Sequence, residues 1–126
     1  MYKPKQRDIV ILDFDPSKGY EIKKRRPALI MSSDDYNRTT NLVIVCPITS
    51  AEKEHPFFIP IESEKFNNIK KSKVNTNQVF SLDYTKPASR NIQYLDTLNE
   101  EKFYEITQMF MHNFSFKLVW KNWASV

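Results

Sequence analysis

The chain has 126 residues, a formal net charge of +4 and a sequence pI near 9.1. This length fits one domain with its own core, although a dimer interface would add usefully to burial. The basic charge mildly favours a polyanionic partner, and the single cysteine, Cys46, excludes an internal disulfide. No apolar run reaches the length of a signal peptide or membrane span, so we expect a soluble, cytoplasmic protein without membrane attachment.

Short apolar runs separated by turn formers predict a mainly β fold. The expected strands cover residues 9–14, 27–31, 42–46, 57–61 and 74–82. Pro60 should place the fourth strand at a sheet edge, because proline has no N–H to donate. Ser33 has the side chain of a helix cap and predicts a helical turn directly after it. Cys46 ends a continuous β-branched run and is expected in the core.

Near the C-terminus, the apolar residues change from the spacing of a strand to that of a helix. Thr97 to Glu100 fits a capping box, and a helical stripe of apolar residues follows it. The residues of that stripe are Phe103, Ile106, Phe110 and Phe114. The stripe predicts a helix that contacts the core or a second subunit.

The segment between the first two predicted strands concentrates positive charge around the only glycine of the chain, Gly19. Glycine adopts positive φ at little cost, so a flexible loop is expected here. The cations around Gly19 are Lys18, Lys23, Lys24, Arg25 and Arg26, and the acid nearest to it is Glu21. Such a loop can clamp a phosphodiester, and a solvated surface loop is the alternative interpretation.

Three motifs occur in order along the chain: Asp-Phe-Asp-Pro-Ser-Lys-Gly at 13–19 with Glu21, Arg-Pro-Ala-Leu at 26–29, and Pro-Ile-Thr-Ser at 47–50. Together they resemble the MazF/PemK family of toxin endoribonucleases, from about residue 8 to about residue 114. The resemblance implies an α+β, mainly β fold: an SH3-like small β-barrel with short helices and a C-terminal helix, as in CcdB and PemK. We expect this single domain in residues 1–116, with 117–126 as a C-terminal extension of uncertain order.

The resemblance also implies an activity and partners. Family members are type II toxins that cut single-stranded mRNA at specific sequences, without a metal or other cofactor. They are usually homodimers and are held inactive by a cognate acidic antitoxin. In such a reaction the RNA 2′-hydroxyl attacks the adjacent phosphorus, which leaves a 2′,3′-cyclic phosphate and a 5′-hydroxyl end.

Matching the motifs residue by residue gives Arg26, Thr49 and Glu21 as the expected catalytic set. The planar guanidinium of Arg26 suits two phosphate oxygens, and the Thr49 hydroxyl is a second donor. Glu21 is the natural base because arginine holds its proton at any ordinary pH. Its alternative role is to pair with a neighbouring lysine, and the acid and base assignments stay open.

RNA-binding residues follow from the same motifs and from the chemistry of base recognition, which uses aromatic stacking and amide contacts. The expected residues are Phe14, Asp13, Lys18, Lys23, Lys24, Arg25, Ser50, Asn77 and Gln78. Phe14 alternates with Val10 and Leu12, so core packing explains it equally well.

Two other functions stay open at this point. Trp120 and Trp123 permit a non-enzymatic gyrase poison similar to CcdB, and the basic, aromatic surface permits an SH3-like module that binds peptides. Neither alternative needs Arg26 and Thr49 at their observed spacing. Many relatives begin the first strand with Gly-Asp, whereas this chain has Arg7-Asp8. His55 and His112 match no motif.

Overall fold

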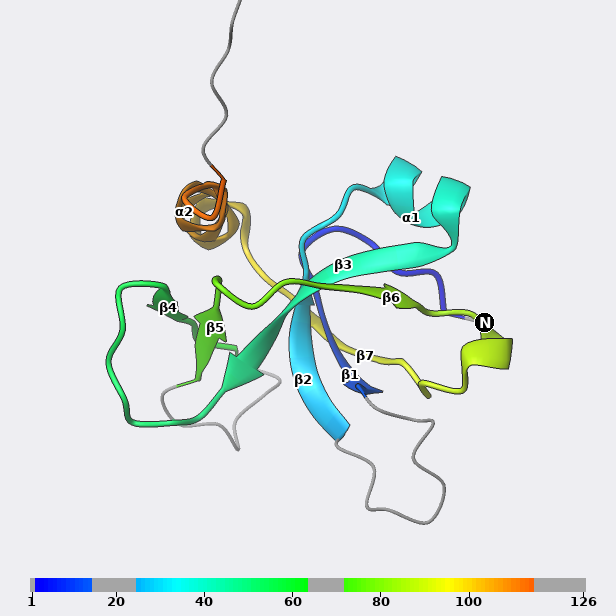
Figure 1. The fold of residues 1–126 in the computed structure, drawn as a ribbon, viewed down its shortest axis with the longest axis horizontal. Helices are drawn as coiled ribbons and strands as arrows, with labels where there is room; N and C mark the ends of the chain where they lie inside the picture. The colour runs from blue at the N-terminus through cyan, green and yellow to red at the C-terminus, as the bar shows by residue number, and fades with distance from the viewer. Residues whose placement is uncertain (1, 15–24, 64–71, 115–126) are drawn as a thin grey trace, which may run out of the picture.

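The computed structural model describes residues 2–14, 25–63 and 72–114 (Figure 1). Its elements in chain order are β1 (Asp8–Asp13), β2 (Arg25–Ile30), α1 (Asp34–Thr40), β3 (Leu42–Thr49), β4 (Phe58–Pro60), β5 (Lys73–Asn75), β6 (Phe80–Asp83), the 3₁₀ helix η1 (Lys86–Ala88), β7 (Gln93–Thr97) and α2 (Glu100–Met111). Among these residues no helix is long and apolar enough to span a bilayer.

Seven strands form one antiparallel sheet with the order β4-β5-β3-β2-β1-β7, and β6 pairs with β3 off this path. The two ends of the path, β4 and β7, do not pair with each other, so the barrel-like sheet is not closed. The predicted mainly β, small-barrel class is confirmed. Pro60 lies in the end strand β4, as its missing N–H predicted.

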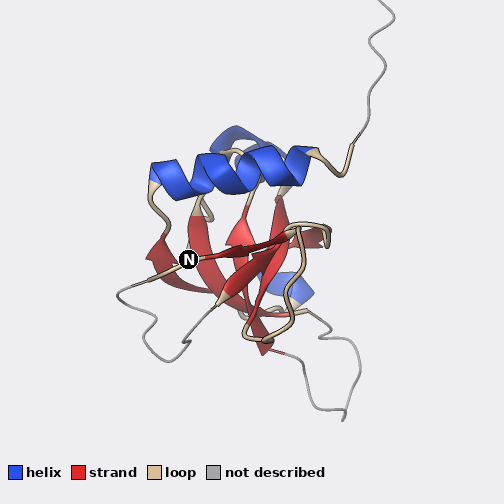
Figure 2. Cartoon of the chain, turned by 90° about the vertical axis from the view of Figure 1, so that its left-hand side faces the viewer, coloured by secondary structure: helices blue, strands red, loops and turns tan. Residues whose placement is uncertain are grey.

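Successive side chains of the central strands point to opposite faces of the sheet, so the domain has two apolar layers. On one face, Ile9 and Leu29 pack with Phe103 and Ile106 of α2, and all four are buried. Figure 2 shows α2 lying along one side of the strands. On the other face, Val10 and its neighbours pack in a second cluster that includes strands β2, β3 and β6. The central strands are therefore covered on both sides, which fixes their register.

The predicted strand at 74–82 is wrong as a single element, because it forms two short strands that pair with different parts of β3. β5 pairs with Ile48 and Thr49, whereas β6 pairs with Leu42–Val45. Between them, the Asn75 side chain accepts from the Asn77 N–H at 3.2 Å, a local turn that ends β5. The Thr76 hydroxyl donates to the Phe57 carbonyl at 2.6 Å and holds the turn against the preceding segment.

Both helices follow the predicted apolar and capping chemistry, with one difference. The Ser33 hydroxyl accepts from the Tyr36 N–H and caps α1, as expected. The predicted capping box at Thr97 is wrong: Asn99 caps α2 and accepts from the Lys102 N–H at 2.8 Å. Thr97 instead ends β7, a strand that the sequence analysis did not anticipate, and its hydroxyl donates to Asp8 at 3.1 Å.

The apolar stripe of α2 is confirmed as a core contact. Phe103 and Ile106 are buried in the first cluster, and Phe110 packs against its edge. Phe114 is 43% exposed and contacts the Phe110 ring with the ring centroids 5.6 Å apart. The stripe thus leaves the core toward its C-terminal end.

The cap of α2 can be tested by substitution. Asn99→Ala removes an acceptor for a free N–H of the first turn and should lower the free energy of unfolding by about 1 kcal/mol. Asn99→Asp keeps the acceptor and should stay close to the parent protein. Urea unfolding followed by circular dichroism measures both; equal stability of Asn99→Ala and the parent would contradict the assigned cap.

Candidate functional site

The catalytic residues expected on β2 and β3 lie at the same end of these two strands. The strands pair antiparallel with Ala28 opposite Pro47 and Ile30 opposite Val45. Continuing this register by two residues places Arg26 opposite Thr49, on the same face of the sheet. Both side chains line one cavity of about 440 Å³. The structure thus brings together two residues that are 23 positions apart in the chain.

Arg26 and Thr49 are both free to bind a ligand. Arg26 is exposed and forms no ion pair within the part of the chain that the structure describes. The Thr49 hydroxyl accepts a hydrogen bond from the Ala51 N–H at 3.1 Å, which orients the oxygen and leaves its proton available. A cation and an oriented hydroxyl therefore line the same cavity, an arrangement suited to an oxyanion.

Two further predicted residues line this cavity, and among its other lining residues one cation, one aromatic ring and one amide were not predicted for the site. Ser50 and Gln78 are the predicted ones. Lys53, Phe58 and Asn75 are the additions. Lys53 adds a second cation, and half-buried Phe58 adds an aromatic ring. In the sequence, the position of Lys53 four residues after Thr49 indicates only weakly that it belongs to the site.

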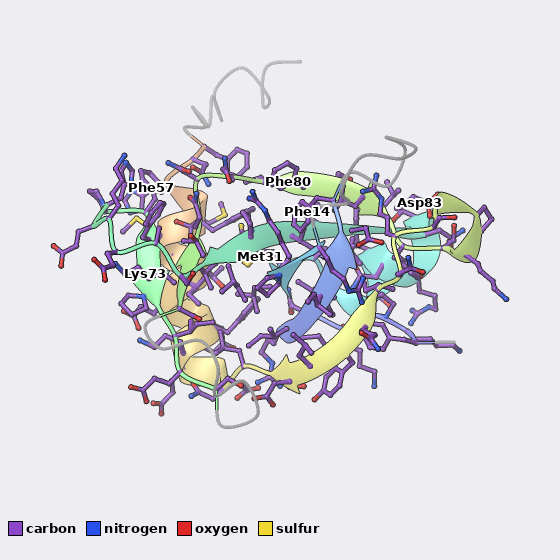
Figure 3. All side chains as sticks on the ribbon, turned by 90° about the horizontal axis from the view of Figure 1, so that it is seen from below. Phe14, Met31, Phe57, Lys73, Phe80 and Asp83 are labelled. Carbon is purple, nitrogen blue, oxygen red and sulfur yellow. The ribbon has the colours of Figure 1, made fainter. Side chains whose placement is uncertain are left out.

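The new residues reach the cavity through the β4–β5 pair. Phe58 lies opposite Asn75 in that pair, so both project from the same face. The side-chain oxygen of Asn75 accepts from the Asn77 N–H, which leaves the amide group of Asn75 free to donate. The Lys53 carbonyl accepts from Lys73 Nζ at 3.2 Å, which ties the segment after β3 to β5. Figure 3 shows Lys73 and Phe57 on this side of the molecule.

Asp13 and Phe14 lie near the end of β1, where Asp13 is buried and Phe14 is half-buried. Asp13 is 3% exposed, and its carboxylate accepts from Arg25 at 3.4 Å and from Asn91 at 2.9 Å. Phe14 is half-buried against the second apolar cluster and contacts Phe80 edge to face at 5.1 Å (Figure 3). Core packing therefore accounts for much of the Phe14 ring surface.

The remaining predicted residues lie outside this cavity or outside the described ranges. Asn77 is exposed in the turn next to Gln78. Four predicted residues belong to the segments that are not described: Glu21, Lys18, Lys23 and Lys24. The same is true of Trp120 and Trp123, and of the expected extension at 117–126.

Other groups that carry reactive chemistry have structural explanations. Cys46 is fully buried in the core, as predicted, and burial raises the pKa of its thiol to about 12. His55 Nδ1 accepts from the Phe57 N–H at 3.2 Å, and the His55 ring packs on Phe57 and Phe58. His112 caps the C-terminal end of α2. None of these three residues lines the cavity of Arg26 and Thr49.

The fold is a small, barrel-like β domain, and the cavity lined by Arg26, Lys53 and the Thr49 hydroxyl lies where β2 begins and β3 ends. Residues 5–114 match the family described as the PemK-like, MazF-like toxin of type II toxin-antitoxin systems. The chain therefore belongs to this toxin family, as the sequence motifs indicated.

Individual relatives agree with this assignment. The chain is 32% identical over 68 residues to the endoribonuclease toxin MazF of Escherichia coli K12, a match that covers 54% of this chain. It spans 61% of that relative's length. A crystal structure of MazF from Deinococcus radiodurans is similar with a TM-score of 0.72 and 29% identity, over 89% of this chain and 96% of that one.

A second solved structure shows a relative with a bound partner. In a MazE–MazF complex from Deinococcus radiodurans, the matching chain has a TM-score of 0.70 and 27% identity, over 89% of this chain and 95% of that chain. A Mycobacterium tuberculosis toxin, MazF-mt6, shares the fold with a TM-score of 0.68 at 18% identity, over 88% and 99% of the two chains.

Burial of Cys46 predicts an inert thiol. Thiolate is the reactive form, so a pKa of about 12 leaves about one thiol in ten thousand ionised at pH 8. Iodoacetamide at pH 8 should leave the native protein unmodified and should alkylate the urea-unfolded protein. Lys86→Cys, which adds an exposed thiol on η1, serves as the control that reacts in the native state. Rapid alkylation of native Cys46 would contradict its core position.

Proposed function

We propose that this chain is the toxin of a type II toxin-antitoxin system and acts as a metal-independent, sequence-specific endoribonuclease on single-stranded mRNA in the cytoplasm. The observation that carries the proposal is that Arg26, which forms no ion pair among the described residues, lines the same cavity as the Thr49 hydroxyl. Membership of the toxin family and the similarity to the Escherichia coli endoribonuclease MazF support it.

The proposed reaction breaks the bond between phosphorus and the 5′-oxygen after the adjacent 2′-hydroxyl attacks phosphorus. The products are a 2′,3′-cyclic phosphate and a 5′-hydroxyl end. Negative charge grows on the two non-bridging oxygens during this attack. The guanidinium fork of Arg26 matches these two oxygens, and the Thr49 hydroxyl donates a further hydrogen bond. Ser50 is a second hydroxyl within the same cavity.

The cleavage reaction also needs two proton transfers. A base removes the 2′-hydroxyl proton, and an acid delivers a proton to the 5′-oxygen as it leaves. Glu21 is our candidate for the base, because carboxylate is the natural acceptor among the motif residues. Its position belongs to the segment that is not described, so this assignment depends on the family motif alone.

RNA recognition is assigned to groups around and beside the cavity. Gln78 and Asn75 offer amides to base edges, and the exposed part of Phe14 offers a ring for stacking. Lys53 adds charge for the phosphate backbone. The basic segment with Lys18, Lys23 and Lys24 and the exposed Asn77 extend the proposed binding surface.

Two partners complete the proposal. A cognate acidic antitoxin segment would occupy the same cationic surface as RNA and compete with it. Support comes from the MazE–MazF complex among the similar structures. A homodimer is proposed as well, because Tyr104, Met111 and Phe114 expose apolar surface on and after α2.

The catalytic proposal is tested by incubating the protein with a long single-stranded RNA in EDTA and mapping the fragment ends. Discrete cuts that end in cyclic phosphate are expected. Arg26→Lys keeps the charge and loses the planar fork, so it should lower kcat/KM by about 10² to 10³. Arg38→Lys, on the exposed face of α1 outside the cavity, is the matched control and should cut like the parent. No cuts by the parent protein over many RNA sequences would refute the activity.

The shared surface for RNA and antitoxin predicts a strong salt dependence. Each phosphate of a single strand that is contacted should contribute about −0.7 to the slope of log affinity against log salt. Fluorescence anisotropy with an uncleavable, 2′-deoxy-substituted oligonucleotide measures this slope. An acidic antitoxin peptide should displace the oligonucleotide and lose affinity as salt rises. Simultaneous binding of peptide and oligonucleotide would contradict a shared surface.

A further inference from the structure

A network of polar side chains centred on a buried carboxylate lies where β1 ends and β2 begins. Its centre is the Asp13 carboxylate, which accepts from Arg25 on β2 and from the Asn91 amide before β7. Arg25 also donates to the Gln93 side chain at 2.9 Å. The network therefore joins the ends of three neighbouring strands through one carboxylate.

Arg90 supplies the second part of this network. Its guanidinium donates to the main-chain carbonyls of Asp13 and Phe14, at 3.2 and 2.8 Å. The Arg90 carbonyl in turn accepts from the Asp13 N–H at 2.8 Å. The main chain at the end of β1 is thus held by Arg90 from two sides.

The backbone around Arg90 is held in an uncommon conformation. Ser89 and Asn91 both have positive φ, 56° and 50°, which costs free energy for a residue other than glycine. Asn91 uses this conformation to aim its amide at Asp13, whereas the Ser89 side chain makes no such contact. The strained segment between η1 and β7 is therefore maintained by its bonds to Asp13 and Phe14.

We propose that Asp13, Arg90 and Asn91 are positioning residues for the cleavage of RNA, an inference that depends on the proposed function. They fix the end of the β1–β2 pair, and Arg26 is the residue that follows Arg25 in that pair. Holding Arg25 on Asp13 sets the backbone from which the Arg26 guanidinium reaches the cavity. Arg26 then meets the phosphate in a fixed orientation, which limits the loss of conformational freedom in the transition state.

This role differs from direct RNA binding, which the sequence motifs suggested for Asp13 and Arg25. A carboxylate that is 3% exposed and accepts from two donors has little capacity left for a base edge. The side chain of Arg25 is one-third exposed, but it is already engaged by Asp13 and Gln93. Its contribution to RNA affinity should accordingly be smaller than that of Arg26, for which the described part of the chain offers no ion-pair partner.

A pair of glycine substitutions separates positioning from general stability. Asn91→Gly relieves the positive φ and removes the amide that donates to Asp13, whereas Ser89→Gly relieves a similar strain and leaves the network intact. We expect Asn91→Gly to lower kcat about tenfold or more, with KM and the salt slope of RNA binding unchanged. Ser89→Gly should match the parent in all three quantities. An unchanged kcat in Asn91→Gly would overturn the inference.

Arg90→Met is the second variant. The salt dependence of its RNA affinity distinguishes a direct phosphate contact from a positioning role for Arg90. A direct phosphate contact would make the slope shallower by about 0.7, whereas a positioning residue leaves it unchanged and lowers kcat. A shallower salt slope of RNA binding with an unchanged kcat would therefore overturn the inference for Arg90.

A third readout does not depend on cleavage. In a nitrogen-15 NMR spectrum, the Arg26 Nε–H signal is identified by its disappearance in Arg26→Lys. This signal should shift in Asn91→Gly and stay in place in Ser89→Gly. An unmoved signal in both would overturn the inference. If the parent protein cuts no RNA while the signal does shift, the proposed function fails and the network's control of Arg26 stands.

Discussion

The pairing of β2 with β3 is the constraint on which the rest of the domain depends. It aligns Leu29 with Cys46 and Ile30 with Val45, all fully buried, so each face of the pair belongs to one of the two apolar clusters. A shift of one residue would turn every one of these side chains to the opposite face. The register that the core enforces is also the register that sets Arg26 opposite Thr49. Core and site are thus specified by the same contacts.

Two prolines explain why a cavity opens at this end of the pair. Pro27 and Pro47 have no N–H, so neither can donate to the strand ladder. The ladder between β2 and β3 ends at Ala28 and Pro47, and β3 then pairs through Ile48 and Thr49 with β5. The pairing between β2 and β3 therefore stops before Arg26 and Thr49. Both side chains line the cavity at this end of the pair.

Much of this architecture was readable from the sequence, because alternation and turn formers act locally. The central strands, the Ser33 cap and the α2 stripe follow from such patterns, and the motifs placed Arg26 and Thr49 in one site. The errors arose where a distant contact decided the outcome. Thr97 fits a capping box locally, but its hydroxyl bonds to Asp8 across the sheet and Asn99 caps the helix instead.

The missed site residues have the same cause. Phe58 and Asn75 reach the cavity only because β4 and β5 pair with each other and β5 joins the end of β3. Nothing in the spacing of these two residues indicates that arrangement. Asp13 shows the reverse case: its motif suggested a substrate contact, but burial is a property of the folded sheet and cannot be read from the motif.

Arg25 and Arg26 show how one dipeptide serves two purposes. Successive residues of a strand point to opposite faces, so two adjacent arginines enter different environments. Arg25 lies opposite Asp13 and is neutralised by a buried carboxylate, whereas Arg26 lies opposite Leu12, whose side chain offers no charge. Among the described residues no acid pairs with Arg26, and an unpaired cation attracts anions. Arg25 thus contributes to the strand pairing, whereas Arg26 carries the charge that the proposed function assigns to the phosphate.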